Sequence, residues 1–344
     1  MAPVHILYVL EATDGGTRRH LRDLVCGLPS GFSATVVVST LRDPAFARED
    51  RPVYQEAGAR WIELPMRRSA GAGDFMAVRR LRKLLHSLRP DIVHAHSSKA
   101  GAVARLASRG DFPVVYTPHG FSLLMPGFVW PYRLFETFAV RWTDAVICVT
   151  EEESRLAQSL GYADGRIHVI RNGITPPVPP SCVSAAREGI GFFGRDVPQK
   201  GADVLRACKG LPVRFFTHYP QGEAIALMRT VAVAAMPSRW EGCPYALLEA
   251  WAAGTPVVAS AVGGLKELIR HGENGWLLPP DATPGEWERE LGNILRDPSL
   301  RERLAEGGRR SFAAHTLSGM LEKTLSVYRA VLGKTGGPCR AREG

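Results

Sequence analysis

The sequence has few cysteines and no cysteine pair with metal-binding spacing. Its 344 residues include six cysteines, and none of them forms a Cys-x-x-Cys motif. This scarcity argues against a disulfide-stabilised secreted domain and against a structural zinc domain. The cysteine usage fits a protein of a reducing cytoplasm.

Long hydrophobic runs are also missing from the sequence. No apolar stretch approaches the ~20 residues that a membrane-spanning helix needs. The N-terminus has neither the basic segment nor the cleavage site of a signal peptide, and residues 5–10 have the length of a buried strand. We therefore expect a cytoplasmic location, with the inner face of the plasma membrane as a possible site of peripheral attachment.

The formal net charge is +9, and the basic residues are unevenly distributed. Residues 60–109 contain eleven Lys or Arg against three acidic residues. A basic segment of this kind suits an anionic partner, such as a phospholipid surface or a pyrophosphate lipid, although an ordinary solvated surface is an equal alternative. Nucleic acid is the least favoured partner because no RNA- or DNA-binding motif accompanies the segment.

Strand-like and helix-like segments alternate along the first half of the chain. Short apolar or β-branched segments occupy residues 5–10, 34–40, 60–65, 92–95, 114–117 and 145–150. Helical periodicity occupies residues 17–28, 74–89, 101–108 and 132–142. This alternation predicts βαβ units and a parallel sheet that is covered on both faces.

A proline-rich break then separates two predicted domains. Residues 175–180 read Thr-Pro-Pro-Val-Pro-Pro, and the alternation restarts with a strand at 191–193. The length suits two domains of about 150 to 170 residues. We expect a Rossmann-like acceptor domain at residues 1–174, a linker at 175–188 and a shortened Rossmann-like nucleotide-sugar domain at 189–315. A helix at 316–334 could return to the first domain, and residues 335–344 are expected to form a disordered tail.

The strongest chemical signal lies at residues 237–260. A strand ends at Pro237, a loop carries Glu241, Pro244 occupies a first helical position, and Gly254 ends the helix. The free backbone N–H groups at the start of this helix, which belong to Tyr245, Ala246 and Leu247, would suit a diphosphate. Glu241 and Glu249 can accept hydrogen bonds from sugar and ribose hydroxyls.

This segment resembles the E-x7-E signature of the retaining GT-B glycosyltransferases of family 4. Further matching motifs occur in the family's order. A glycine loop lies at residues 15–16, residues 171–174 close the first domain, and residues 193–201 open the second. The remaining motifs lie at 94–101, 117–121, 263–267 and 272–276. The resemblance covers most of the chain. It implies the GT-B fold, in which two Rossmann-like doubly wound domains face a central cleft.

The resemblance also implies roles for individual residues. Arg195 and Lys200 would bind the donor diphosphate and neutralise the charge of the leaving group. Glu249 would bind the ribose. His119 and Glu241 would lie at the reaction centre, on the donor sugar. Gly16 would allow close approach of the backbone to the phosphate or the acceptor.

The implied reaction retains the anomeric configuration by a front-face route in which the leaving phosphate helps to deprotonate the acceptor hydroxyl. No cofactor or metal is expected, because the sequence has no Asp-x-Asp motif and two cations can take the metal's place. The sequence departs from the family between Lys200 and Glu241, where one strand–helix unit is missing. Because this region borders the nucleobase in relatives, the sequence does not decide between a UDP-sugar and a GDP-sugar donor.

The acceptor can be approached only through the basic segment and an apolar loop at residues 121–132. The loop is either buried or dips into a bilayer. Together these segments favour a polyprenyl-diphosphate-linked glycan as acceptor, as in the assembly of bacterial exopolysaccharide or cell-surface polysaccharide. The candidate acceptor- or membrane-contacting residues are Lys99, Arg79, Arg80, Arg82 and Lys83.

Other classes of protein remain open at this point. A dinucleotide-dependent oxidoreductase would need Gly-x-Gly-x-x-Gly after the first strand, which the sequence lacks. A GT-B sugar epimerase or phosphorylase also remains open, and analysis of the reaction products would distinguish it from a glycosyltransferase. A non-catalytic GT-B partner subunit of another transferase is suggested by the shortened second domain.

Overall fold

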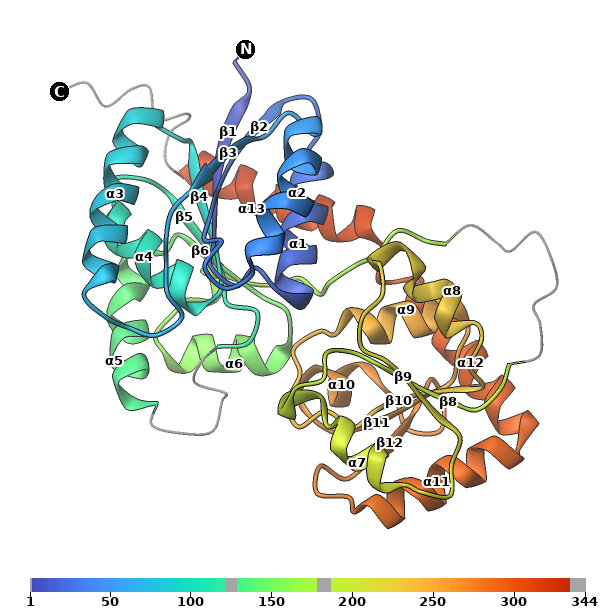
Figure 1. Ribbon diagram of the computed structural model, residues 1–344. Coiled ribbons are helices and arrows are strands. Elements are labelled where there is room, and N and C mark those ends of the chain that lie inside the picture. The colour runs from blue at the N-terminus through green and yellow to red at the C-terminus, as the bar shows by residue number, and fades with distance from the viewer. Residues whose placement is uncertain (1, 122–128, 178–186, 335–344) are drawn as a thin grey trace. The chain divides into compact units, whose positions relative to one another are not determined.

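The computed structural model describes residues 2–121, 129–177 and 187–334. The chain divides into two compact units (Figure 1). The first unit comprises residues 1–170 and 321–344, and the second comprises residues 171–320. The sequence had placed the boundary after residue 174. The expected linker lies largely outside the described residues, and the expected tail lies wholly outside them.

The first unit is built on a seven-stranded parallel sheet with the order β3-β2-β1-β4-β5-β6-β7. The strands β1 to β7 are Val4–Leu10, Phe32–Val38, Arg60–Glu63, Ile92–His96, Val114–Thr117, Ala145–Cys148 and Ile167–Val169. The helices α1 to α6 are Gly15–Cys26, Pro44–Glu56, Gly73–Leu88, Ser98–Ser108, Trp130–Ala139 and Glu151–Ser159. Figure 1 shows α1 and α2 on one side of the sheet, and α3 and α4 on the other.

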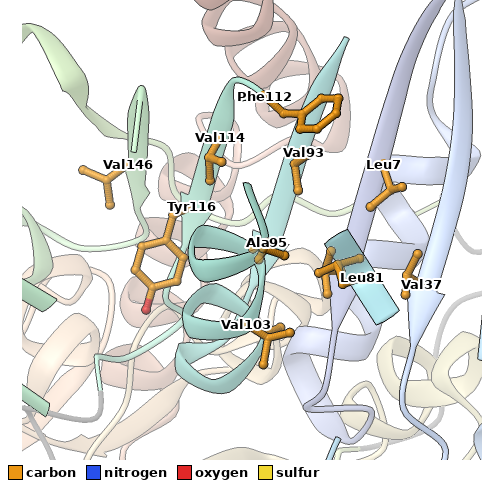
Figure 2. Close-up of a cluster of buried hydrophobic side chains, with 14 of the residues drawn as sticks. Leu7, Val37, Leu81, Val93, Ala95, Val103, Phe112, Val114, Tyr116 and Val146 are labelled. Atoms are coloured by element: carbon orange, nitrogen blue, oxygen red, sulfur yellow. The ribbon is translucent and has the colours of Figure 1, made fainter. Parts of the chain in front are cut away.

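Strand β4 shows why the sheet needs both layers of helices. Side chains alternate along a strand, and Val93 and Ala95 join the buried cluster that includes Leu81 of α3 and Val103 of α4 (Figure 2). His94 and His96, on the opposite face, are buried as well. One face of the strand therefore builds an apolar core, whereas the other buries imidazoles.

The last helix, α13 (Leu317–Lys334), returns to the first unit. Its residues from Leu321 onward belong to that unit. The Tyr328 hydroxyl lies 2.6 Å from His94 Nδ1 and 3.3 Å from the Tyr8 hydroxyl. All three side chains are buried. The C-terminal helix thus completes the polar face of β4.

The second unit has a five-stranded sheet with the order β12-β11-β10-β8-β9, and every pair in it is parallel. The strands β8 to β12 are Ile190–Phe193, Val213–Phe216, Val233–Met236, Val257–Ser260 and Trp276–Leu278. The helices α7 to α12 are Ala202–Ala207, Ala224–Met228, Tyr245–Ala253, Gly263–Leu268, Pro284–Arg296 and Pro298–Phe312. The 3-10 turns η4 (Pro198–Lys200) and η5 (Gln221–Glu223) precede α7 and α8.

Most predicted strands and helices are present, but four elements were not predicted. Helices α2 and α6 are rich in charged residues, and α2 contains Pro52 in addition to its initial Pro44. Strands β7 and β12 have only three residues each and lie at sheet edges. Local patterns are weakest in polar helices and short edge strands.

One member of the predicted basic surface is buried instead. Arg105 of α4 is fully buried, and its two terminal nitrogens donate to the Glu136 carboxylate of α5 at 2.8 and 2.9 Å. The guanidinium also lies over the Tyr116 ring, 4.2 Å from its centroid. The inclusion of Arg105 in the basic surface was therefore wrong, because the charge count could not show that an acidic residue 31 positions away neutralises it.

The buried pair should be a large local determinant of stability. We expect Arg105→Met to lower the free energy of unfolding by about 3–5 kcal/mol, because it leaves the Glu136 carboxylate buried without its partner. Urea unfolding followed by circular dichroism measures this change. The double variant Arg105→Met/Glu136→Met is expected to regain most of the loss. An Arg105→Met protein as stable as the wild type would contradict a buried charge pair.

Candidate functional site

The strand order identifies one edge in each unit where a ligand would bind. In doubly wound sheets, ligands bind outside the carboxyl ends of the strands, where the strand order reverses. This reversal lies between β1 and β4 in the first unit, and between β8 and β10 in the second. The segments that follow these strands are therefore the candidate site of each unit.

In the second unit, the segments after β8 and β10 meet through an ion pair. Lys200 Nζ lies 2.5 Å from Glu241 Oε1, and the Ser238 hydroxyl donates to the same oxygen at 2.7 Å. The Glu241 side chain is only 7% exposed, and that of Lys200 is 20% exposed. The structure therefore brings together Lys200, which the sequence analysis had assigned to the donor diphosphate, and Glu241, which it had assigned to the reaction centre, and it adds Ser238.

Two glycines allow the surrounding backbone to pack against the Glu241 loop. Gly201 has φ +68°, and a Cβ at this position would lie 2.0 Å from the Pro237 carbonyl oxygen. Gly263 has φ +41°, and a Cβ there would lie 2.0 Å from the Glu241 carbonyl oxygen. The Gly264 N–H donates to that same carbonyl at 3.1 Å. Only glycine satisfies both the left-handed backbone and the close approach.

Helix α9 begins one residue later than predicted. Pro244 is the N-cap residue in an extended conformation, and Tyr245 is the first helical residue. The Leu247 N–H donates to the Pro244 carbonyl at 3.1 Å, so the prediction of a free N–H at Leu247 was wrong. A tight first turn closes this bond within the helix. Glu249, one turn further on, is 4% exposed.

The structure also places Arg195 and two residues of the motif at 171–174. Arg195 follows β8 and is exposed. Asn172 donates from Nδ2 to the Cys243 carbonyl at 2.7 Å, and Arg171 lies 3.7 Å from the Glu267 carboxylate. The segment that the resemblance placed at the close of the first domain thus holds the second unit's loop.

In the first unit, the candidate site is a cluster of histidines. His119 follows β5 in the left-handed conformation, with φ +53°, and its Nε2 lies 3.1 Å from His96 Nδ1. His20 of α1 packs edge-on against the His119 ring, with the ring centroids 4.5 Å apart. Burial lowers the pKa of His96 and of His119 well below the usual value, so both imidazoles are neutral.

A buried carboxylate that the sequence analysis missed holds the His119 turn. Glu153 of α6 accepts hydrogen bonds from the backbone N–H of Gly120 and from that of Val149, the latter at 2.7 Å. The Thr150 hydroxyl caps α6 by accepting the Glu153 N–H at 3.1 Å. The Thr-x-x-Glu spacing signals a helix start, but it does not reveal that the glutamate fixes the residue after His119.

His94 supports the cluster from beneath. Its Nε2 lies 2.8 Å from the Thr117 hydroxyl, and its ring lies against His96 with the centroids 4.0 Å apart. Together with the Tyr328 contact at Nδ1, this uses both nitrogens of His94. Residues 94–101 form one of the family-like motifs, but the resemblance implied no role for His94 or His96.

The segment after β1 contributes polar groups to the same edge. Glu11 Oε1, Thr13 Oγ1 and His96 Nε2 are buried and have no hydrogen-bond partner among the described residues. Burial raises the pKa of Glu11, and Arg42, 3.6 Å away, opposes the rise. Buried polar atoms without partners are uncommon in folded proteins, so their presence here suits a ligand.

Gly16, which was predicted to let the backbone approach the ligand, follows Gly15, which has the left-handed backbone conformation. Gly15, the first residue of α1, has φ +65°, whereas Gly16 has no left-handed backbone. The conformational requirement for glycine therefore applies to Gly15.

The basic residues predicted for the acceptor or membrane divide into two groups. Lys99 is bound to the Asp74 carboxylate at 2.7 Å, and Arg82 to the Asp111 carboxylate at 2.7 Å. These two side chains connect elements of the first unit. The other three predicted residues are exposed on α3, and they are Arg79, Arg80 and Lys83.

Comparisons with known proteins give the same assignment for both halves of the chain. Residues 15–173 match the model of the glycosyl transferase 4-like domain, and residues 209–311 match that of the glycosyl transferases group 1. A D-inositol 3-phosphate glycosyltransferase of Jonesia denitrificans is 30% identical over 69% of this chain and 71% of its own. One from Xylanimonas cellulosilytica is 34% identical over the same shares.

Solved structures share the fold at lower identity. Anabaena Alr3699/HepE in complex with UDP-glucose superimposes with a TM-score of 0.76 at 20% identity, over 95% of this chain and 99% of that one. WaaG, a glycosyltransferase involved in lipopolysaccharide biosynthesis, gives a TM-score of 0.69 at 18% identity, over 94% and 99%. With its two parallel-sheet domains of the GT-B fold, this chain belongs to the glycosyltransferases, with a glycosyl transferase 4-like N-terminal domain and a group 1 C-terminal domain.

Proposed function

We propose that this glycosyltransferase transfers a sugar, with retention of configuration, from a UDP- or GDP-sugar to a lipid-linked glycan. The Lys200–Glu241 pair at the β8/β10 switch point carries the proposal. A cation bound to the loop that leads into α9 suits a diphosphate, and a carboxylate fixed beside that cation suits a sugar hydroxyl. The fold neighbour that holds UDP-glucose supports a nucleotide-sugar donor.

The proposed roles follow from the chemistry of each group. Arg195 and Lys200 bind the diphosphate, assisted by the backbone N–H groups of Tyr245 and Ala246. As the glycosidic bond to the donor breaks, these cations stabilise the charge on the departing diphosphate. No metal is needed for this charge, because two cations already provide it.

The remaining roles concern the two sugars. Glu249 accepts from the ribose hydroxyls, and Glu241 accepts from a hydroxyl of the transferred sugar. His119 contacts that sugar at the reaction centre. The leaving phosphate accepts the acceptor's proton, so the protein's contribution is positioning and charge stabilisation. The product belongs to exopolysaccharide or cell-surface polysaccharide assembly.

The lipid-linked acceptor is supported by an apolar surface of the first unit. Seven large hydrophobic side chains are exposed among the described residues, and six of them lie at the start of α3 or on α5: Phe75, Met76, Trp130, Tyr132, Leu134 and Phe138. Both helices contact α4. Figure 1 shows α3 and α5 along the same edge of the unit.

The charge of this surface complements an anionic membrane. Arg79, Arg80 and Lys83 of α3 and Arg133 of α5 are exposed. The acid of α5, Glu136, is buried against Arg105 and leaves the exposed face basic. Each basic residue near an anionic surface adds about 1 kcal/mol of attraction. No described helix combines the length and the apolar character needed to span a bilayer.

The donor roles predict different effects for the two members of the ion pair. Lys200→Ala should weaken UDP or GDP binding about tenfold or more, because a charge-assisted hydrogen bond contributes about 1.5–3 kcal/mol. Glu241→Gln should bind the nucleotide as tightly as the wild type or more tightly, because Lys200 is no longer neutralised, yet turnover should fall at least about 10²-fold. Calorimetry and a transfer assay measure these effects.

Lys209→Ala provides the matched control, because Lys209 is an exposed lysine just beyond α7. Its nucleotide affinity should equal that of the wild type. Unchanged nucleotide binding in Lys200→Ala would contradict the diphosphate role. Equal losses of nucleotide affinity in both pair variants would indicate that the loop has merely collapsed.

The stereochemistry and the absence of a catalytic metal can be tested in one reaction. With an α-linked donor sugar, we expect an α-linked product by NMR of the anomeric proton. Transfer should continue at the same rate after dialysis against EDTA. A β-linked product would exclude the retaining route, and loss of activity in EDTA that Mg²⁺ or Mn²⁺ restores would exclude the metal-free diphosphate site.

The apolar surface predicts binding to anionic vesicles. We expect the protein to sediment with phosphatidylglycerol vesicles and to be released as salt increases. Leu134→Glu/Phe138→Glu should weaken this binding at least about tenfold, because it removes two exposed apolar side chains that would enter the bilayer and adds charge of the same sign as the lipid. The control is Leu41→Glu, which changes an exposed leucine outside both helices. Equal vesicle binding by all three proteins would argue against this surface.

A further inference from the structure

The histidine cluster of the first unit has the composition of a transition-metal site. One ring nitrogen each of His20, His96 and His119 lies within 4.8 Å of the others. The three residues come from α1, from the end of β4 and from the turn after β5. None of the roles proposed above uses His20 or His96.

The distances suit a tetrahedral ion. With Zn–N bonds of about 2.0–2.1 Å, two ligand nitrogens of such an ion are about 3.3 Å apart. His96 Nδ1 and His119 Nε2 are 3.1 Å apart. The widest separation in the group is at most 4.8 Å, so binding of an ion would close it by up to about 1.5 Å.

The second nitrogen of the His96 ring is compatible with this arrangement. His96 is fully buried, and its Nε2 has no hydrogen-bond partner among the described residues. A buried imidazole nitrogen without a partner loses the hydrogen bond that water would have supplied. Because no described group donates to Nε2, that nitrogen can carry the ring's proton while Nδ1, which faces His119, presents its lone pair to an ion.

The surroundings hold the imidazoles in place before any ion binds. His94 packs against the His96 ring and is itself fixed by Thr117 and Tyr328. Glu153 fixes the backbone directly after His119 through the Gly120 N–H. Such outer contacts restrict the rotation of metal-binding histidines and raise metal affinity.

We propose that His20, His96 and His119 bind a zinc-class divalent ion through three imidazole nitrogens, and that the bound ion inhibits transfer. The group contains three nitrogen ligands and no carboxylate, which favours Zn²⁺, Cu²⁺ or Co²⁺ over Mg²⁺ or Ca²⁺. His119 is half-buried, whereas His20 and His96 are buried. Binding stands independently of the proposed function, whereas inhibition rests on it, because coordination withdraws His119 from the donor sugar.

Cobalt titration of the whole protein tests binding without any assay of activity. Adding Co²⁺ to EDTA-treated protein should produce the visible absorption of a four- or five-coordinate ion, saturating at one ion per chain, and Zn²⁺ should displace it. His20→Ala should weaken Co²⁺ binding about 10-fold or more, because one of three ligands is lost. His86→Ala, which removes an exposed histidine of α3, should bind as the wild type does.

Folding and inhibition are checked on the same proteins. Circular dichroism and thermal melting should show that His20→Ala remains folded. His96→Gln, which removes another proposed ligand, is a second variant for the same Co²⁺ titration. If transfer is active, Zn²⁺ should reduce it in the wild type and in His86→Ala, and less so in His20→Ala. A spectrum of six-coordinate cobalt, or equal affinity in wild type and His20→Ala, would overturn the site. Normal nucleotide binding in that case would leave the proposed function intact.

Discussion

Parallel pairing of the strands is the constraint on which both candidate sites depend. Every paired strand in the two sheets runs in the same direction as its neighbour, so all carboxyl ends in one sheet reach a single edge. His96 and His119 are 23 residues apart, yet they meet because β4 and β5 pair in parallel. Lys200 and Glu241 are 41 positions apart, and they meet because the strands before them, β8 and β10, are neighbours. Antiparallel pairing would send each member of these pairs to opposite edges.

The two edges solve the problem of buried polar groups in different ways. In the second unit, Lys200 and Ser238 both contact one oxygen of Glu241, and Gly201 and Gly263 let the backbone close around the loop. Charge is balanced within the protein there. In the first unit, the polar groups are mainly neutral imidazoles and orphaned oxygens, because burial disfavours their charged forms. In the second unit, an anion can therefore replace Glu241 as the partner of Lys200. In the first unit, a ligand can instead bind to buried polar atoms that have no hydrogen-bond partner among the described residues.

The sequence predicted those features that depend on local patterns. Buried parallel strands are continuous apolar segments, so β1, β5 and β10 were visible, and the Glu241 loop was marked by proline and glycine on both sides. Helix α2 was not visible, because its start is a capping contact from Asp43 and its interior contains a proline. The availability of the Leu247 N–H was misjudged because it depends on the conformation of Pro244, three residues earlier. Spacing along the chain does not specify a turn's internal hydrogen bond.

Contacts between distant residues were the features that the sequence could not supply. Tyr328 reaches His94 across 234 positions, and Arg105 finds its acid on another helix. The first contact carries a consequence for function, because the helix that bears Tyr328 follows the whole second unit in sequence and returns to support the histidines of the first. A substitution at Tyr328 therefore changes the support of His94, against which His96 packs, without touching His96 itself. The C-terminal helix is thus a structural part of the N-terminal site, and the first unit is complete only when the chain has traversed the second.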